Sequence, residues 1–143
     1  MRAKVLDESG EIIHAIIFDT GEEPVSQLTR FAEKHNITAA RFTAIGAFSD
    51  VVVGYFDWDR KDYLRIPIRE QVEVLSLVGD IAVADGKPKL HAHVVLGKRD
   101  GSAHGGHLLE ARVRPTLEVL LTESPAWLRC RHDPETGLAL IRF

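Results

Sequence analysis

Short β-rich runs separated by turn residues constrain the fold of this chain more than any other feature. Runs of β-branched, aromatic and other apolar residues are interrupted by glycine, asparagine and aspartate along most of its length. This pattern is typical of strands joined by tight turns. The predicted strands cover residues 2–6, 11–18, 39–45, 48–57, 63–68, 72–78, 90–96, 108–113, 117–122 and 138–143, with turns that include Asp7-Glu8-Ser9-Gly10, Gly46, Gly79-Asp80 and Asp100-Gly101.

One segment has a helical period instead. Apolar residues follow Pro24 at helical spacing, and the spacing predicts a helix from about Pro24 to His35 that stops at Asn36. A single main helix among many strands predicts an α+β fold with a largely antiparallel mixed sheet. The runs at 51–53 and 75–77 lack a clean alternation and need cover on both faces, which one helix cannot supply. We therefore expect a homo-oligomer.

Composition limits the class of protein. The 143 residues are 45% hydrophobic, which fits a single domain over residues 1–143. A net charge of −3 argues against a protein that binds by neutralising many phosphates, although Arg112, Arg114, Arg129 and Arg131 could line a local basic patch. Cys130 is the sole cysteine, and no signal-like or membrane-spanning apolar segment is present, so we expect a cytoplasmic protein without membrane contact.

Histidines carry the clearest chemical signal. His91 and His93 lie two residues apart in a predicted strand, so both side chains project from the same face. The Asp100-Gly101 turn would return the chain alongside and bring a third imidazole from His107 or, as an alternative, from His104. Three histidines leave the fourth position of a tetrahedral zinc ion open to water or substrate, as in catalytic zinc sites. Histidine pairs also occur in strands for ordinary packing reasons.

Carboxylates and glycines near these histidines have two interpretations each. Glu73, Asp80 and Glu110 could orient a ligand imidazole, and Glu73 or Glu110 could act as a general base. Solvated surface carboxylates are the more common interpretation of any one of these residues. The pair Gly105-Gly106 could offer backbone amides to an anion, but it more often marks a close approach between strands. No nucleophile elbow, phosphate loop or dinucleotide fingerprint is present.

Several ordered segments together resemble the PPC domain, the plants-and-prokaryotes conserved domain. These segments are the run Gly46-Ala47-Phe48-Ser49-Asp50-Val51, residues 73–82, Leu90-His91-Ala92-His93, Asp100-Gly101 and Gly105-Gly106-His107-Leu108-Leu109. The resemblance covers roughly residues 5–123. It implies a homotrimeric α+β domain and a metal, zinc, held by His91, His93 and His107.

The resemblance also implies a function. Prokaryotic members of this family are commonly labelled as DNA-binding, and the plant domain follows an AT-hook. Here Gly86-Lys87-Pro88-Lys89 is only superficially similar to that hook, because Asp85 replaces its first basic arm. Our first hypothesis is a regulatory module that associates with DNA or with DNA-bound proteins and carries a three-histidine zinc site. The alternative is a metal-dependent enzyme that acts on a small molecule.

Overall fold

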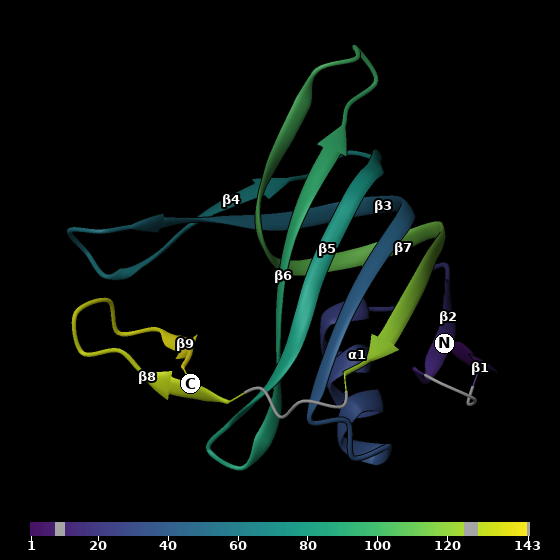
Figure 1. Cartoon of the computed structure of the whole chain (residues 1–143). Coiled ribbons are helices and arrows are strands. Elements are labelled where there is room, and N and C mark those ends of the chain that lie inside the picture. The colour runs from purple at the N-terminus through teal and green to yellow at the C-terminus, as the bar shows by residue number, and fades with distance from the viewer. Residues whose placement is uncertain (8–10, 125–128, 143) are drawn as a thin grey trace.

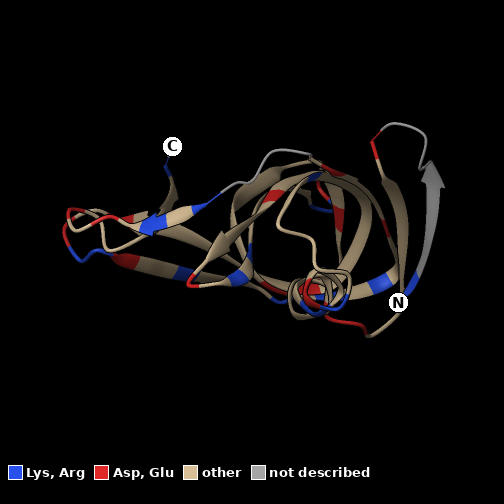
Figure 2. Cartoon of the chain, turned by 60° about the horizontal axis from the view of Figure 1, so that its bottom comes forward, with Lys and Arg blue, Asp and Glu red and all other residues tan. Residues whose placement is uncertain are grey.

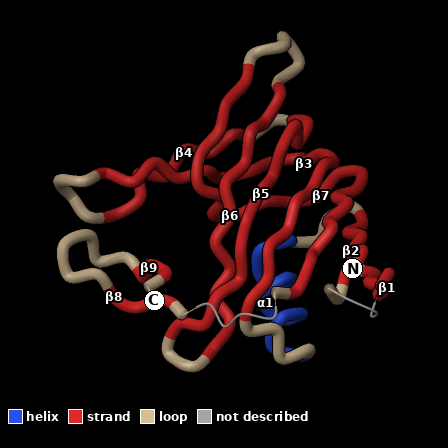
Figure 3. Tube along the Cα trace, in the orientation of Figure 1, coloured by secondary structure: helices blue, strands red, loops and turns tan. Residues whose placement is uncertain are grey.

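The computed structural model describes residues 1–7, 11–124 and 129–142, and within them strands predominate over a single helix (Figure 3). The predicted α+β class with a largely antiparallel sheet is confirmed. The helix is too short to cross a membrane. The elements are β1 (Arg2–Asp7), β2 (Ile13–Asp19), α1 (Pro24–Lys34), β3 (Ala39–Asp57), β4 (Asp62–Ile68), β5 (Val72–Ala84), β6 (Lys87–Gly97), β7 (Ala103–Glu123), β8 (Cys130–His132) and β9 (Ala139–Ile141).

Four strands form a closed ring. The sheet order is β1-β2-β7-β6-β5-β3-β4, and β3 pairs in addition with β7. Strands β3, β5, β6 and β7 are therefore each hydrogen-bonded to two others of the set (Figure 1). Closure of this kind removes the unpaired edges that an open sheet would expose. It also places β6 between β5 and β7.

Several predicted strand boundaries were wrong, in two places because glycines that predicted turns lie inside strands. The segments 39–45 and 48–57 form the single strand β3, with a register shift next to Gly46. Likewise, 108–113 and 117–122 belong to β7. Gly79 and Asp80 lie within β5, where a side chain on Gly79 would collide with the ring of Phe42. The predicted turn at residues 8–10 lies outside the described residues, and β8 was not predicted.

The helix packs against the ring as its period predicted. Leu28, Phe31 and Ala32 are buried in the same core as Ile16 and Phe18 of β2. The Glu23 carboxylate accepts hydrogen bonds from the first free amides of the helix, and these amides would otherwise lack partners. Asn36 has a left-handed φ of 55°, which agrees with its predicted role as the stop.

The single chain covers part of the apolar sheet and leaves another part exposed. Val51 and Val53 are buried within the chain, so the expectation that they need a partner subunit was wrong. Leu75, in contrast, is 55% exposed, and Val78 and Val95 on the neighbouring part of β5 and β6 are 50% and 44% exposed. Exposed apolar side chains therefore lie on β5 and β6, and also on β3, where Ile45 and Tyr55 are 60% and 66% exposed.

Candidate metal centre

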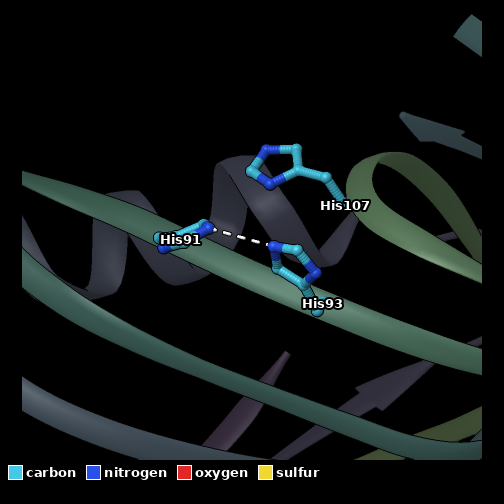
Figure 4. Close-up of side chains that lie close together, drawn as sticks. All are labelled: His91, His93 and His107. Atoms are coloured by element: carbon cyan, nitrogen blue, oxygen red, sulfur yellow. Dashed lines mark hydrogen bonds between the residues drawn. The ribbon is translucent and has the colours of Figure 1, made fainter. Parts of the chain in front are cut away.

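Three imidazoles meet at the junction of β6 and β7. His91 and His93 are two residues apart on β6 and project from one face, as predicted. The chain turns at Lys98 to Ser102 and returns as β7, which places His107 directly opposite His93. In Figure 4 the His107 ring lies beside the dashed line that joins His91 to His93. Two adjacent antiparallel strands thus bring together residues that are fourteen positions apart.

The distances within this three-histidine cluster are short. The Nε2 atoms of His91 and His93 are 3.1 Å apart. The three ring centroids are separated by 5.1, 5.2 and 5.4 Å, and one nitrogen from each ring lies within 4.8 Å of the others. Two nitrogens bound to one tetrahedral zinc ion at 2.0–2.1 Å are roughly 3.3 Å apart. The His91–His93 pair therefore has nearly the spacing that a shared ion requires.

The glycine pair before His107 lets β7 run close to both of its neighbours. A Cβ atom at Gly105 would lie 2.6 Å from the carbonyl oxygen of Val94, and one at Gly106 would lie 2.7 Å from the carbonyl oxygen of Gly54. Both distances are shorter than side chains tolerate. The close-approach interpretation of this pair is therefore confirmed, and the glycines serve to position His107.

The local environment keeps two of the imidazoles neutral. The pKa of His107 is lowered from 6.5 to about 4, mainly by burial and in addition by the charges of His91, His93 and Lys89. Burial, followed by the charge of His91, also lowers the pKa of His93. A neutral imidazole has a free lone pair, whereas an imidazolium cannot bind a metal. At neutral pH these rings are therefore in the protonation state that a metal needs.

The Nδ1 atom of His107 supplies a direct test of whether the site fits a metal. This atom is buried and has no hydrogen-bond partner among the described residues. Buried polar atoms without partners are rare, because each costs about 1–3 kcal/mol. A cation bound between the rings would give this nitrogen a partner. The donor set and the unpartnered nitrogen both fit a transition-metal ion.

Asp80 is the carboxylate that lies beside the cluster. It is opposite His91 in the β5–β6 register, and its Oδ2 is 3.7 Å from Nδ1 of His91, too far for a hydrogen bond. Glu73 lies opposite Gly97, and it is five residues before Val78, the residue that lies opposite His93. Glu110 forms a salt bridge with Arg65 on β4. The structure thus brings Asp80, but neither Glu73 nor Glu110, to the histidines.

His104 does not join the cluster. It is exposed and lies opposite Leu96 in the β6–β7 register, three residues from His107. An odd offset along a strand turns two side chains to opposite faces. The sequence spacing allowed either His104 or His107 as the third histidine. The structure places His107 beside His91 and His93.

Tyr63 belongs to the site, although the sequence did not point to it. Its ring stacks on His107, with centroids 4.4 Å apart and planes inclined by 21°, and burial raises the pKa of its phenol. The stack needs Gly54, because a Cβ atom there would lie 2.7 Å from the Tyr63 ring. In the sequence, the only sign of this contact was a glycine within a β-rich run. That glycine points to Tyr63 only once the pairing of β3 with β4 is known.

A cavity of about 260 Å³ opens beside the histidines. His91 and His107 line one side of it, together with Asp80 and Lys89. The opposite side belongs to the hairpin of β8 and β9, which stands beside the ring in Figure 1. Cys130 also lines the cavity. The cluster therefore faces a space large enough for a small molecule.

The chain belongs to the family defined by the Plants and Prokaryotes Conserved (PCC) domain, whose model matches residues 6–125. A metal-containing protein from Archaeoglobus fulgidus is 36% identical (TM-score 0.84; 99% of this chain and 97% of that chain covered). A plant- and prokaryote-conserved protein from Pyrococcus horikoshii is 30% identical, with a TM-score of 0.87, and the match covers 96% of this chain and 98% of that chain. A candidate DNA-binding protein from Bacteroides thetaiotaomicron is 26% identical, with a TM-score of 0.88, and the match covers 99% of this chain and 97% of that chain. No curated protein matches the chain significantly.

The unpartnered nitrogen of His107 leads to a prediction about stability. In the presence of a chelator, His107→Phe should be more stable to unfolding than the original chain by about 1 kcal/mol, because it removes a buried polar atom and retains the stack on Tyr63. Urea denaturation monitored by circular dichroism measures the change. His104→Phe, at an exposed position of the same strand, is the matched control and should show no gain. A less stable His107→Phe protein would mean that the nitrogen carries no such cost.

Proposed function

We propose that this protein binds a divalent transition-metal ion, with zinc as the preferred metal, through His91, His93 and His107. The observation that carries this proposal is that three imidazoles converge while, among the described residues, the buried Nδ1 of His107 has no hydrogen-bond partner. A relative 36% identical over almost the whole chain is described as metal-containing, which supports the same conclusion. When bound with three protein ligands, the ion would supply a Lewis acid with a position free for a further ligand.

Metal content should depend on the cluster and not on other histidines. His91→Ala and His107→Ala should each lose most of their zinc, because removing one of three ligands costs several of the roughly 10–16 kcal/mol of a structural zinc interaction. Inductively coupled plasma emission of dialysed protein measures the ratio of zinc to chain. His104→Ala, on the same strand as His107 but outside the cluster, should keep its zinc. Full zinc occupancy in both cluster variants would remove this assignment.

We propose a regulatory role for the metal-loaded protein, in which it reaches DNA mainly through a DNA-bound partner. The resemblance to a candidate DNA-binding protein supports an association with DNA. Direct recognition has less support, because acidic and basic residues are interspersed (Figure 2). Arg112 and Arg114 lie on β7 of the large sheet, whereas Arg131 lies on β8 of the two-stranded sheet and Arg129 just before it. The four arginines are thus divided between two parts of the fold.

Binding of the isolated protein to duplex DNA should therefore be weak and independent of sequence. With a net charge of −3, any affinity would come from a few phosphate contacts and should fall steeply between about 50 and 200 mM salt. Fluorescence anisotropy with two unrelated labelled duplexes across these salt concentrations measures it. Tight binding to one duplex that persists at the higher salt would instead favour direct sequence recognition.

We also propose that the chain assembles as a homotrimer. The exposed apolar residues Leu75, Val78 and Val95 on β5 and β6 would be covered by neighbouring copies, which removes apolar surface from water. Sedimentation equilibrium at micromolar concentration should give three times the chain mass of 15.9 kDa. Val78→Lys should shift the protein toward smaller species, whereas Arg99→Lys at the exposed β6–β7 turn should not. A folded monomer of the original chain would exclude this assembly.

A metal-dependent enzyme acting on a small molecule is the second function that we propose. The specific observation in its favour is the cavity of about 260 Å³, which is lined by His91, His107 and Asp80. A structural zinc site has four protein ligands, whereas within the described residues this cluster offers three. Asp80 is better placed than Glu73 or Glu110 to act on a bound molecule, because it is the one of the three that lines the cavity.

A further inference from the structure

We infer that the cavity beside the histidines binds a small organic anion. The charged group of this anion would lie toward His91 and Lys89, and its hydrocarbon part would lie against the hairpin of β8 and β9. The inference rests on the metal binding proposed above and names the class of molecule that the same site would take. It follows from three features of the cavity, namely its charge, its apolar wall and its size.

The charge of the cavity would be positive with a metal in place. Three imidazole ligands are neutral and leave the double charge of the ion uncompensated, unlike a set that contains thiolates or carboxylates. The Lys89 ammonium group lines the same cavity, and its charge acts on both His107 and Cys130. Asp80 compensates only part of this charge. A ligand with a negative group would therefore be attracted and a cationic one repelled.

Lys89 is available for such a ligand. Among the described residues it forms no salt bridge, whereas Lys98, on the turn after the same strand, is paired with Glu70. Lys87, two residues before Lys89, does not line the cavity, whereas His91, two residues after it, does. Residues two apart on a strand share a face, so Lys89 and His91 point to the same side of β6.

The opposite wall is apolar. Leu138, Leu140 and Ile141 line the cavity from the hairpin of β8 and β9. These side chains are partly exposed in the single chain, so a hydrocarbon group that covers them would remove apolar surface from water. An inorganic anion such as phosphate would satisfy the positive side and leave this wall uncovered. The cavity therefore favours an organic acid over an inorganic anion.

The size of the cavity sets the scale of the ligand. Pockets for drug-sized molecules typically occupy about 300–1,000 Å³. The cavity here has about 260 Å³, which suits a short-chain acid and excludes a nucleotide or a peptide segment as a fully enclosed ligand. Butyrate is a suitable probe, because it has one carboxylate and a short hydrocarbon chain.

Isothermal titration calorimetry of the zinc-loaded protein tests the inference with three probes. Butyrate should bind, formate should bind about tenfold more weakly because it cannot cover the apolar wall, and butylamine should give no binding heat. Lys89→Met should weaken butyrate binding by about fivefold, as expected for loss of a partly exposed charge pair. Lys87→Met is the matched control on the same strand and should change it by less than about twofold.

The outcomes separate this inference from the metal proposal. Zinc content is measured first on each protein, and a chain that holds no zinc would overturn both. A zinc-loaded protein that binds butyrate no better than butylamine would overturn the anion site alone. Equal weakening by Lys89→Met and Lys87→Met would also overturn it, because the effect would then reflect overall charge. Unfolding curves of the two variants show whether either change affects the fold.

Discussion

The backbone pairing of β3 with β7 is the interaction on which the rest of the structure depends. Both strands are long and bent, and each pairs with several neighbours, so their contact turns an open sheet into a closed ring. Gly46 permits the closest approach, since a Cβ atom there would lie 2.2 Å from the carbonyl oxygen of Thr116. The same pairing holds Gly54 opposite His107 and thereby fixes the third imidazole and its stack on Tyr63.

The three-histidine cluster has features that lower the stability of the fold. Two adjacent strands bring three imidazoles together, and burial lowers the pKa of both His107 and His93. One nitrogen has no partner at all among the described residues. Such local costs persist only where the surrounding structure imposes them, here through the closed ring and the glycines before His107. Binding of a cation would convert these costs into affinity.

Local patterns in the sequence predicted which helices and strands form better than they predicted the residues at which these elements begin and end. The helix followed from its period and from Asn36, and the β-rich runs located most strands. Strand continuity through Gly46 and Gly79 was missed, because a glycine required by a close neighbour has the same local signature as one in a turn. The histidine set was predictable because it needs only a period of two and a short turn. Tyr63 and Lys89 were not, since their places depend on pairing between distant segments.

The hairpin of β8 and β9 has a consequence for how proteins of this family could diverge. The match to the family model covers residues 6–125, whereas Leu138, Leu140 and Ile141, beyond it, line one wall of the cavity. The histidines belong to the ring, whereas the hairpin forms a separate two-stranded sheet, and Arg129 next to it forms a β-bridge with Val83 of β5. Substitutions in the hairpin can therefore alter which molecule is accommodated while the closed sheet and its histidines stay unchanged. Selectivity and scaffold would then evolve as separate modules.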